Sequence, residues 1–304
     1  MEKQRRVIAL GFFDGVHLGH GALLRAVRET AERLEAVPCA FTFDRNPAAV
    51  ITGQTVPLLS TVKDRIRLMR RCYGIREVVV AHFDAMQRME WEDFVKYLSE
   101  DLGVVHVVAG HDFHFGYMGR GNPRRLKEKC AQLGLGCDII QKVERDGITI
   151  SSTYIRGLVA QGEMERAAQF LGHPHSLTQQ VTHGKGIGHS ALGFPTVNLR
   201  LPEGVIVPAF GVYATRVCFS GQSWSAVTNV GVRPTIQDND GRVTVEGFIL
   251  DFDGDLYGQQ VRMEFYKHLR GERKFPSMEA LAQEIRKNAQ ETREYFEAQG
   301  ALPV

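Results

Sequence analysis

The chain has 304 residues, of which 43% are hydrophobic and 24% are charged, and its formal net charge at pH 7 is +2. These values are typical of a globular protein, and the length is sufficient for two domains. A protein that binds nucleic acid usually carries a strong basic excess or stripe, which this balance does not provide. A local group of arginines is expected to form the solvated face of one amphipathic helix: Arg65, Arg67, Arg70 and Arg71. We therefore expect no nucleic-acid partner.

Cysteine usage and apolar runs indicate a cytoplasmic protein with no membrane partner. The cysteines are odd in number and form no CxxC motif: Cys39, Cys72, Cys130, Cys137 and Cys218. Reduced thiols are expected, as in the cytosol. The apolar run near the N-terminus ends at Asp14 and has no small-residue cleavage site, which favours a buried strand over a signal peptide. No apolar stretch approaches the ~20 residues of a membrane-spanning helix.

The first half of the chain alternates short apolar runs with helical patterns. Strands are expected at Arg6–Phe12, Pro38–Phe43, Glu77–Phe83, Val104–Gly110 and Cys137–Ile140. Helices are expected between them, at Gly21–Glu35, Lys63–Tyr73, Trp91–Asp101 and Pro123–Leu133. This alternation predicts a Rossmann-like α/β domain with a parallel sheet covered on both faces.

The second half changes character after two further helices, Ser152–Leu158 and Met164–Leu171. Short β segments separated by Gly, Pro and Asp turns then follow, at Ser176–His183, Gly211–Phe219, Trp224–Val230, Thr244–Leu250 and Gln260–Tyr266. Their rhythm predicts a small antiparallel β-barrel. A last helix is expected from Ser277, as N-cap, to about Gln299. We place the domain boundary after residue 173, giving domains 1–173 and 174–304.

A glycine-rich segment with two histidines joins the first strand to the first helix. His17 and His20 flank Gly19 within Gly11-Phe-Phe-Asp-Gly-Val-His-Leu-Gly-His-Gly. Glycines allow close approach of backbone to phosphate, and a helix N-terminus favours anions. Imidazoles here could stabilise charge that develops as pyrophosphate leaves ATP. A zinc site is the other interpretation, but no companion Cys/His pair at ligand spacing supports it.

A second cluster suited to phosphate stands where a helix begins. Ser151, Ser152 and Thr153 supply hydroxyl groups at the start of the helix, and Arg156 follows one turn later. Hydroxyls beside the helix dipole, together with a guanidinium capable of bidentate contact, could bind ATP phosphates. Without the other motifs, an ordinary N-cap cluster is the alternative interpretation.

These motifs together resemble bacterial bifunctional riboflavin kinase/FMN adenylyltransferases, also called FAD synthetases. Besides the extended HxGH segment, the resemblance includes Phe41-Thr-Phe-Asp-Arg-Asn-Pro, Gly110-His-Asp-Phe-His-Phe-Gly and Ile150-Ser-Ser-Thr-Tyr-Ile-Arg. It implies an N-terminal nucleotidyltransferase domain whose catalytic residues are His17 and His20. The substrate-binding residues that it implies there are Gly11, Phe12, Asp14, Gly15, Asn46, Asp112, Phe113, Phe115, Ser151, Ser152, Thr153 and Arg156.

The second half contains stretches that resemble the riboflavin kinase domain of the same family. Gly193-Phe-Pro-Thr-Val-Asn is similar to its GxPTxN motif, in which Thr196 and Asn198 alternate as in a strand and could ligate Mg²⁺ beside ATP phosphates. The resemblance makes Glu246 the general base toward the ribityl hydroxyl. It further implies substrate contacts at Gly184, Gly188, Gly193, Pro195, Arg270 and Phe275.

The resemblance implies two ATP-dependent reactions: riboflavin to FMN, then FMN to FAD with release of pyrophosphate. We accordingly expect Mg²⁺ as cofactor and small-molecule substrates as the partners of the enzyme. The chain is expected to be a monomer or a weak homo-oligomer. Three histidines depart from the family pattern, at His111, His114 and His189. Two alternatives are therefore kept: a riboflavin kinase with a drifted adenylyltransferase site, and a non-catalytic flavin-responsive regulator.

Overall fold

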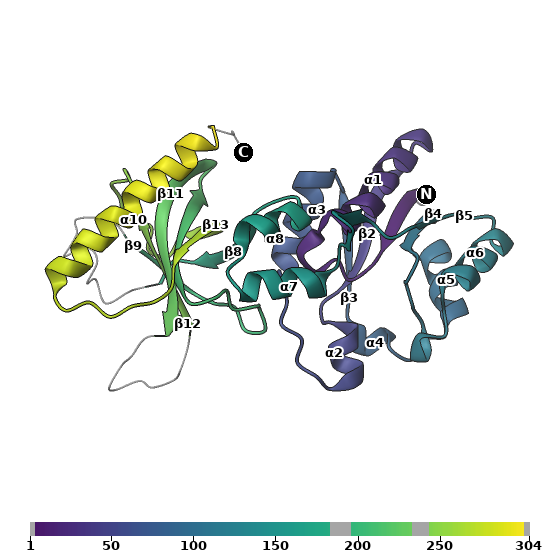
Figure 1. The fold of residues 1–304 in the computed structure, drawn as a ribbon. Helices are drawn as coiled ribbons and strands as arrows, with labels where there is room; N and C mark the ends of the chain where they lie inside the picture. Colours follow the sequence, from purple (N-terminus) through teal and green to yellow (C-terminus); the bar gives the residue numbers. More distant parts are fainter. Residues whose placement is uncertain (1–3, 183–195, 233–242, 301–304) are drawn as a thin grey trace. The chain divides into compact units, whose positions relative to one another are not determined.

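A computed structural model describes residues 4–182, 196–232 and 243–300 (Figure 1). The chain divides into two compact units. The first contains Met1–Val56 and Thr61–Ser152, and the second contains Pro57–Ser60 and Thr153–Val304. This division falls before the boundary at residue 173 that the sequence suggested, because the helices after Ser152 make their contacts with the second unit. The domain limits of 1–173 and 174–304 stay a prediction.

The first unit is built on a parallel five-stranded sheet, as the strand–helix alternation predicted. Its strands are β1 (Arg6–Leu10), β2 (Val37–Phe43), β3 (Glu77–Ala81), β4 (Val104–Gly110) and β5 (Gly136–Ile140). Their order is β3-β2-β1-β4-β5, so the chain reverses its direction of travel across the sheet between β1 and β4. Ligands of open α/β sheets bind at such a reversal, outside the carboxyl ends of the strands.

Two apolar clusters cover the two faces of this sheet because alternate strand residues point to opposite sides. Val7 and Ala9 of β1 pack in a cluster with residues of α1 (Leu18–Arg33) and α3 (Val62–Tyr73). Ile8 and Leu10 pack in the other, with residues of α5 (Trp91–Glu100) and α6 (Pro123–Gln132). The expected three-layer arrangement is confirmed.

Several short elements that the sequence analysis did not predict surround the carboxyl ends of the strands. They are the 3₁₀ turns η1 (Asp14–Val16) and η2 (Tyr117–Gly119), the helices α2 (Pro47–Thr52) and α4 (Phe83–Met86), and the hairpin strands β6 (Glu144–Arg145) and β7 (Ile148–Thr149). The strand expected at Glu77–Phe83 ends at Ala81, because the Asp44 carboxylate accepts a hydrogen bond from the Phe83 amide (3.0 Å) where α4 begins.

The second unit is a curled antiparallel sheet with helices α7 (Ser152–Ala160), α8 (Met164–Leu171) and α10 (Met278–Ala298). Its strands are β8 (His175–Gln180), β9 (Thr196–Arg200), β10 (Gly211–Phe219), β11 (Gln222–Val232), β12 (Val243–Ile249) and β13 (Gln260–Arg270). They lie in the order β8-β13-β10-β11-β12-β9. A bridge between Thr182 and Asn198 brings the two edges toward closure, as expected for a small barrel.

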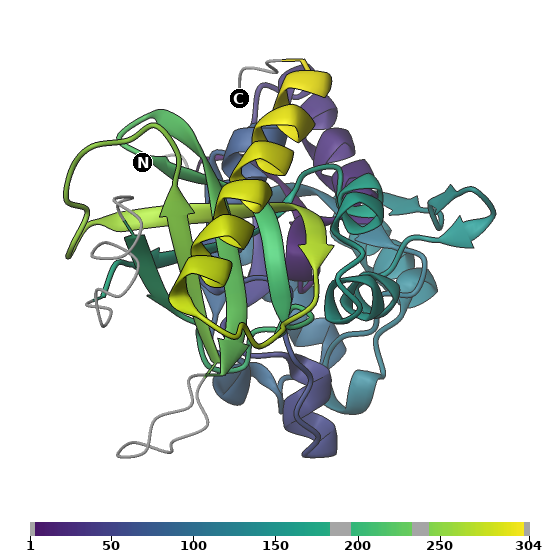
Figure 2. The same cartoon turned by 60° about the vertical axis from the view of Figure 1, so that its left-hand side comes forward.

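The two faces of this sheet have different roles. On the inner face, the Thr215 hydroxyl donates to the Ala226 carbonyl oxygen (3.0 Å), and the Thr228 hydroxyl contacts the Met263 sulfur (3.4 Å). A Cβ on Gly247 would lie 2.8 Å from the Met263 methyl and 3.0 Å from a Val197 methyl, so a larger residue there would require buried side chains to shift. On the outer face, Val212 and Val227 pack against Ala289 of α10. Figure 2 shows α10 lying along the strands, and Ser277 caps it through the Ala280 amide (3.2 Å), as predicted.

Gly116 provides a test of the packing around η2. Its φ is +72°, and an added Cβ would lie 2.6 Å from Trp91 Cα. Gly134 has a similar φ of +70° with nothing within 4 Å of the added Cβ. An alanine at either position incurs about 1–3 kcal/mol of backbone strain, and at Gly116 the combination of φ +72° with ψ 176° is open essentially to glycine alone. We predict that Gly116→Ala loses about 1–3 kcal/mol more, because the clash involves backbone atoms. Equal losses in the free energy of unfolding would contradict this.

Candidate active sites

The turn that follows β1 is held in an unfavourable conformation. Phe13 has φ 58° and Val16 has φ 44°, both positive values that cost an L-residue energy, most of all the β-branched valine. Gly15 between them has φ 74°, which only glycine adopts readily. Strain of this kind persists where the surrounding structure fixes it, and it concentrates at functional sites.

The two histidines of the turn lie against each other at the N-terminus of α1. The rings of His17 and His20 are stacked, with centroids 3.6 Å apart and planes inclined by 11°. His17 is the N-cap, and its Nδ1 accepts the His20 amide (3.2 Å), which leaves Nε2 as its remaining polar atom. A Cβ on Gly19 would lie 3.1 Å from the His17 ring, so the glycine accommodates the stack.

His20 is held in its neutral form. Burial lowers the pKa of His20 well below 6.5, and the nearby His17 and Arg65 lower it further. Its Nδ1 is buried and meets no hydrogen-bond partner in the described part of the chain. A neutral imidazole in this position can donate one hydrogen bond and accept another without adding a second buried charge to the turn.

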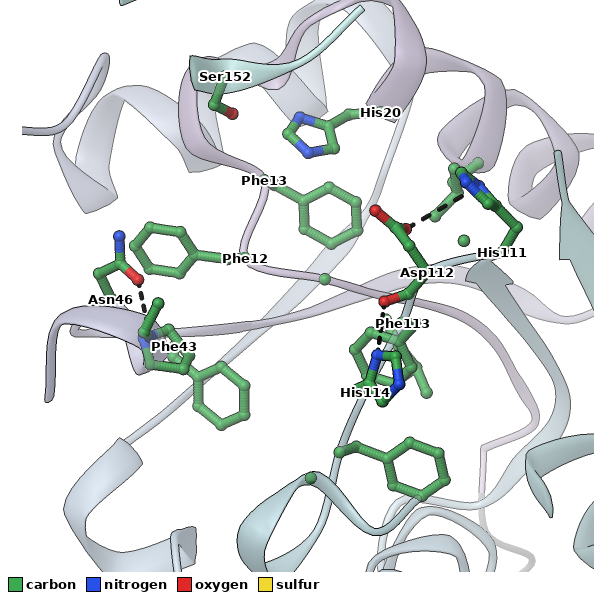
Figure 3. A pocket seen from close by; sticks show the side chains of 18 of the residues that line it. Phe12, Phe13, His20, Phe43, Asn46, His111, Asp112, Phe113, His114 and Ser152 are labelled. Carbon is green, nitrogen blue, oxygen red and sulfur yellow. Dashed lines mark hydrogen bonds and ion pairs between the residues drawn. The ribbon is translucent and has the colours of Figure 1, made fainter. Parts of the chain in front are cut away.

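A pocket of about 980 Å³ opens beside this turn, at the carboxyl ends of the strands (Figure 3). Many of the residues predicted for nucleotide transfer line it together: Gly11, Phe12, His17, His20, Asn46, Asp112, Phe113, Phe115, Ser151 and Ser152. Its volume lies at the large end of the range for small-molecule sites. Asp14 and Gly15 lie in the turn behind its wall and are buried.

Some of these residues also have structural contacts. The Asn46 side chain caps α2 by accepting the Ala48 amide (3.0 Å), and Phe115 is only 7% exposed and belongs to the apolar core. The Phe113 ring stacks on Phe115 with centroids 5.4 Å apart and remains half-buried. Asp112 is largely exposed, with a side-chain exposure of 82%. Of the pair, Phe113 is thus the ring more accessible to a flavin.

Two of the three histidines that depart from the family pattern, His111 and His114, lie close to Asp112. His114 Nδ1 is 2.9 Å from the Asp112 carbonyl oxygen, and His111 Nδ1 is 4.0 Å from the Asp112 carboxylate. Both imidazoles are exposed and line the pocket, as Figure 3 shows. Polar groups that can contact a substrate therefore remain at both positions.

The Ser-Ser-Thr cluster is divided between the two units. The Ser152 hydroxyl donates to the Asp14 carbonyl oxygen (3.0 Å), which ties the end of the first unit to the turn after β1. Thr153 and Arg156 belong to the second unit, and the Arg156 guanidinium lies 3.4 Å from the Thr153 hydroxyl. Neither is among the described residues that line the pocket.

A second pocket, of about 330 Å³, lies on the outer face of the antiparallel sheet beside α10. Glu246 of β12 stands directly opposite Asn198 of β9 and Asn229 of β11. Directly paired residues share one face, so these three side chains form a polar row. The row continues through Val212 of β10 to Arg270 of β13. Glu246, Asn229, Val212 and Arg270 line the pocket, and Asn198 lies on the next strand outward.

Arg270 and Phe275 meet at the wall that α10 provides. Arg270 Nε donates to the Asn288 side-chain oxygen (3.1 Å) and is 3.2 Å from the Glu284 carboxylate. The guanidinium groups of Arg270 and Arg273 lie 5.4 and 4.9 Å from the centre of the Phe275 ring. Phe275 lines the pocket, so both residues predicted for flavin contact are brought to it.

The residues predicted for the ATP and metal side of this site are described only in part. Outside the described residues lie Gly184, Gly188, Gly193 and Pro195, together with His189. Thr196 and Asn198 are two residues apart on β9, as their alternation predicted, with Thr196 half-buried and Asn198 only 5% exposed. Within the described ranges, no group of three or more His, Cys, Asp or Glu side chains could hold a metal ion.

Sequence reasoning missed residues that complete both sites. Arg65 was expected on a solvated helix face, but it is fully buried beneath the turn after β1. That part of the prediction is wrong, because the helix periodicity also places position 65 on the side that packs against the sheet. Nothing in the sequence around Asn229 and Asn288 distinguished either residue from its neighbours. Asn229 reaches the site because it pairs with Glu246 across two strands, and Asn288 because it lies on α10 and accepts a hydrogen bond from Arg270.

Comparisons with known proteins agree with both halves of this description. A family model for FAD synthetase matches residues 1–154, and one for riboflavin kinase matches residues 171–296. Proteins named bifunctional riboflavin kinase/FMN adenylyltransferase are 34% identical in Listeria monocytogenes and 36% identical in Pseudomonas fluorescens. The alignments cover 96% and 90% of this chain and 92% and 88% of those relatives.

A solved structure has the same fold over most of its length. The crystal structure titled macrolide-efflux protein from Streptococcus pneumoniae is similar with a TM-score of 0.83 and 27% identity, covering 96% of this chain and 95% of that one. In the present chain, none of the helices in the described residues is long and apolar enough to cross a membrane.

The depressed pKa of His20 predicts a measurable titration. In an unfolded chain a histidine titrates near 6.5. We expect NMR titration of the folded protein to show His20 still neutral at pH 6. Below about pH 6.5, His20 therefore binds a proton in the unfolded state but not in the folded state. The free energy of unfolding should consequently fall as the pH drops from about 6.5 toward the pKa of His20 in the folded protein. A His20 midpoint at or above 6.5 would contradict this.

Proposed function

Because the chain belongs to the bifunctional riboflavin kinase/FMN adenylyltransferase family, we propose that its two pockets divide the two reactions between them. The chain is a riboflavin kinase, which converts riboflavin and ATP to FMN and ADP. It is also an FMN adenylyltransferase, which converts FMN and ATP to FAD and pyrophosphate. The observation that carries the assignment of sites is the stacked His17–His20 pair in one pocket and the Asn198–Glu246–Asn229 row at the other.

In the first pocket, an FMN phosphate oxygen attacks the α-phosphorus of ATP, and the bond from that phosphorus to the bridging oxygen breaks as pyrophosphate leaves. His17 and His20 stand at the N-terminus of α1, where free amide groups and the helix dipole favour anions. The two imidazoles donate hydrogen bonds to phosphate oxygens as charge builds on the leaving group. The rigid turn holds both rings in place before the reaction.

The remaining predicted residues of this pocket bind substrates. Gly11, Phe12, Asp14 and Gly15 form the wall and its support, and Ser151 and Ser152 supply hydroxyls at its edge. Phe113 offers a ring face to the flavin, with Asn46, Asp112 and Phe115 around it. We assign Thr153 and Arg156 to ATP phosphates on the strength of the motif that they share with Ser151 and Ser152.

In the second pocket, Glu246 accepts the proton of the ribityl 5′-hydroxyl while that oxygen attacks the γ-phosphorus of ATP and ADP leaves. Phosphoryl transfer requires mainly positioning, charge neutralisation and one proton acceptor. Glu246 is half-buried in the row opposite Asn198 and Asn229, whose amides can orient its carboxylate. Arg270 and Phe275 contact the flavin, and Gly184, Gly188, Gly193 and Pro195 belong to the ATP side.

Mg²⁺ would be held by Thr196 and Asn198 together with phosphate oxygens of ATP. The donor set fits, because a hydroxyl and an amide oxygen lie two residues apart on one strand beside a carboxylate, and Mg²⁺ prefers oxygen ligands. When bound, the ion offsets negative charge on the transferred phosphoryl group.

We further propose that the enzyme works in the cytoplasm as a monomer or a weak homo-oligomer with small-molecule substrates and no nucleic-acid or membrane partner. The five cysteines, all within the described residues, form no disulfide, which suits a reducing compartment. Each pocket has its described lining within one unit of one chain. The kinase-only alternative is not favoured, since the FAD synthetase model matches the first half and that half contains a well-formed pocket. A regulator would have no use for a general base.

Glu246→Gln tests the kinase assignment. We expect riboflavin phosphorylation to fall about 100-fold or more, because the amide cannot accept the proton, while FAD formation from supplied FMN stays within twofold of wild type. Glu297→Gln, an exposed change on α10, is the matched control. Product chromatography measures both reactions. Full kinase activity in Glu246→Gln would rule out the proposed role.

His17→Asn and His20→Asn test the adenylyltransferase assignment. Each removes a ring from the stacked pair, and we expect FAD formation from FMN and ATP to fall about 100-fold, as when one stabilising donor is lost. FMN formation from riboflavin should be unchanged. His82→Asn, at an exposed site of the same unit, serves as control. Unimpaired FAD formation in both variants would show that the chemistry lies elsewhere.

A further inference from the structure

A fully buried arginine lies beneath the turn that carries the two histidines. Arg65, on α3, is 0% exposed. Its Nη1 donates to the Phe12 carbonyl oxygen (2.7 Å) and to the Thr42 hydroxyl (3.0 Å), and its guanidinium carbon lies 4.2 Å from the centre of the Phe12 ring. One side chain therefore holds Phe12 by its backbone and by its ring.

Burying a charged side chain with so few partners contributes little to the stability of a fold. Arg65 Nε and Nη2 are buried without a hydrogen-bond partner in the described residues. Burial lowers the pKa of Arg65 to about 10, against the opposing effect of the Asp14 and Asp44 carboxylates. For a buried cation without a bidentate carboxylate partner, the desolvation free energy usually exceeds the stabilisation that its contacts provide. Local costs of this kind are expected where function requires them.

The atoms that Arg65 holds are those that fix the turn. The Phe12 carbonyl also accepts the Thr42 hydroxyl (2.8 Å), and it directly precedes the strained Phe13. On the other side of the turn, Ser152 donates to the Asp14 carbonyl (3.0 Å). The turn is thus held at the carbonyl oxygens of Phe12 and Asp14, on either side of the strained Phe13, upstream of His17 and His20.

We propose that Arg65 is a positioning residue for nucleotide transfer, acting through the Phe12–His17 turn rather than by touching substrate. The inference rests on the function proposed for the first pocket, and Arg65 is not among the described residues lining that pocket. Its guanidinium binds two acceptors and stacks on a ring at once, which the single ammonium of lysine cannot do. Its charge also disfavours protonation of His20.

The test compares Arg65→Met and Arg65→Lys with Arg70→Met, an exposed change on the same helix. Because Arg65 lies in the first unit, thermal unfolding of each variant reports on folding, and kinase turnover in the second unit serves as the internal standard for enzyme concentration. We expect Arg65→Met to lower kcat for FAD formation at least tenfold with KM for FMN and ATP within about threefold, since positioning rather than binding is lost. Arg65→Lys should lose about fivefold, and Arg70→Met should match wild type.

NMR titration of His20 provides a readout that a purely structural role would not change. Its pKa should rise in Arg65→Met and stay depressed in Arg65→Lys, which keeps the charge. A wild-type kcat in folded Arg65→Met overturns the proposal. If Arg65→Met does not fold, Arg65→Lys decides, and a wild-type kcat there overturns it. Unimpaired FAD formation in His20→Asn would instead refute the function of the pocket itself.

Discussion

The strained turn between β1 and α1 is the constraint on which the first site depends. The strand order reverses beside β1, so the chain leaves the sheet where a ligand can approach from its carboxyl edge. Positive φ values at Phe13 and Val16 then direct the start of α1 toward that edge, and the contacts of Arg65 and Ser152 maintain them. Packing around the turn thereby helps to hold the stacked imidazoles of His17 and His20 at a helix N-terminus. Phosphate chemistry benefits from groups that are placed before the substrate arrives.

The second site uses a different constraint, the two-sided character of an antiparallel sheet. Thr215, Thr228 and Met263 fill the inner face, with Gly247 leaving room for the Met263 methyl. The outer face is then available for a polar row, and Glu246 lies in it because its neighbour Gly247 faces inward. Helix α10 supplies Asn288 and Glu284 to hold Arg270 at the same pocket. The two pockets therefore rest on two different structural solutions.

Much of this was predictable from sequence, and the exceptions have physical reasons. Apolar runs such as Val104–Gly110 predicted strands covered on both faces, and Ser277 was correctly expected to cap the last helix. Helices α2 and α4 were not predicted because they are too short to show helical periodicity. Their starts are set by side-chain hydrogen bonds instead, from the Ala48 amide to Asn46 and from the Phe83 amide to the Asp44 carboxylate. The burial of Arg65 was not predicted because arginine side chains are usually exposed. The partners of Glu246 were not predictable, since strand register places them together.

One complementation measurement tests most directly that the two reactions have separate sites in this chain. His20→Asn and Glu246→Gln are incubated together with riboflavin, ATP and Mg²⁺, and the flavins are separated over time. The account predicts that neither variant alone makes FAD from riboflavin at an appreciable rate, and that the mixture does so after a lag in which FMN accumulates. No FAD from the mixture, with both proteins folded, would contradict separate sites, and so would FAD formation at the wild-type rate by either variant alone.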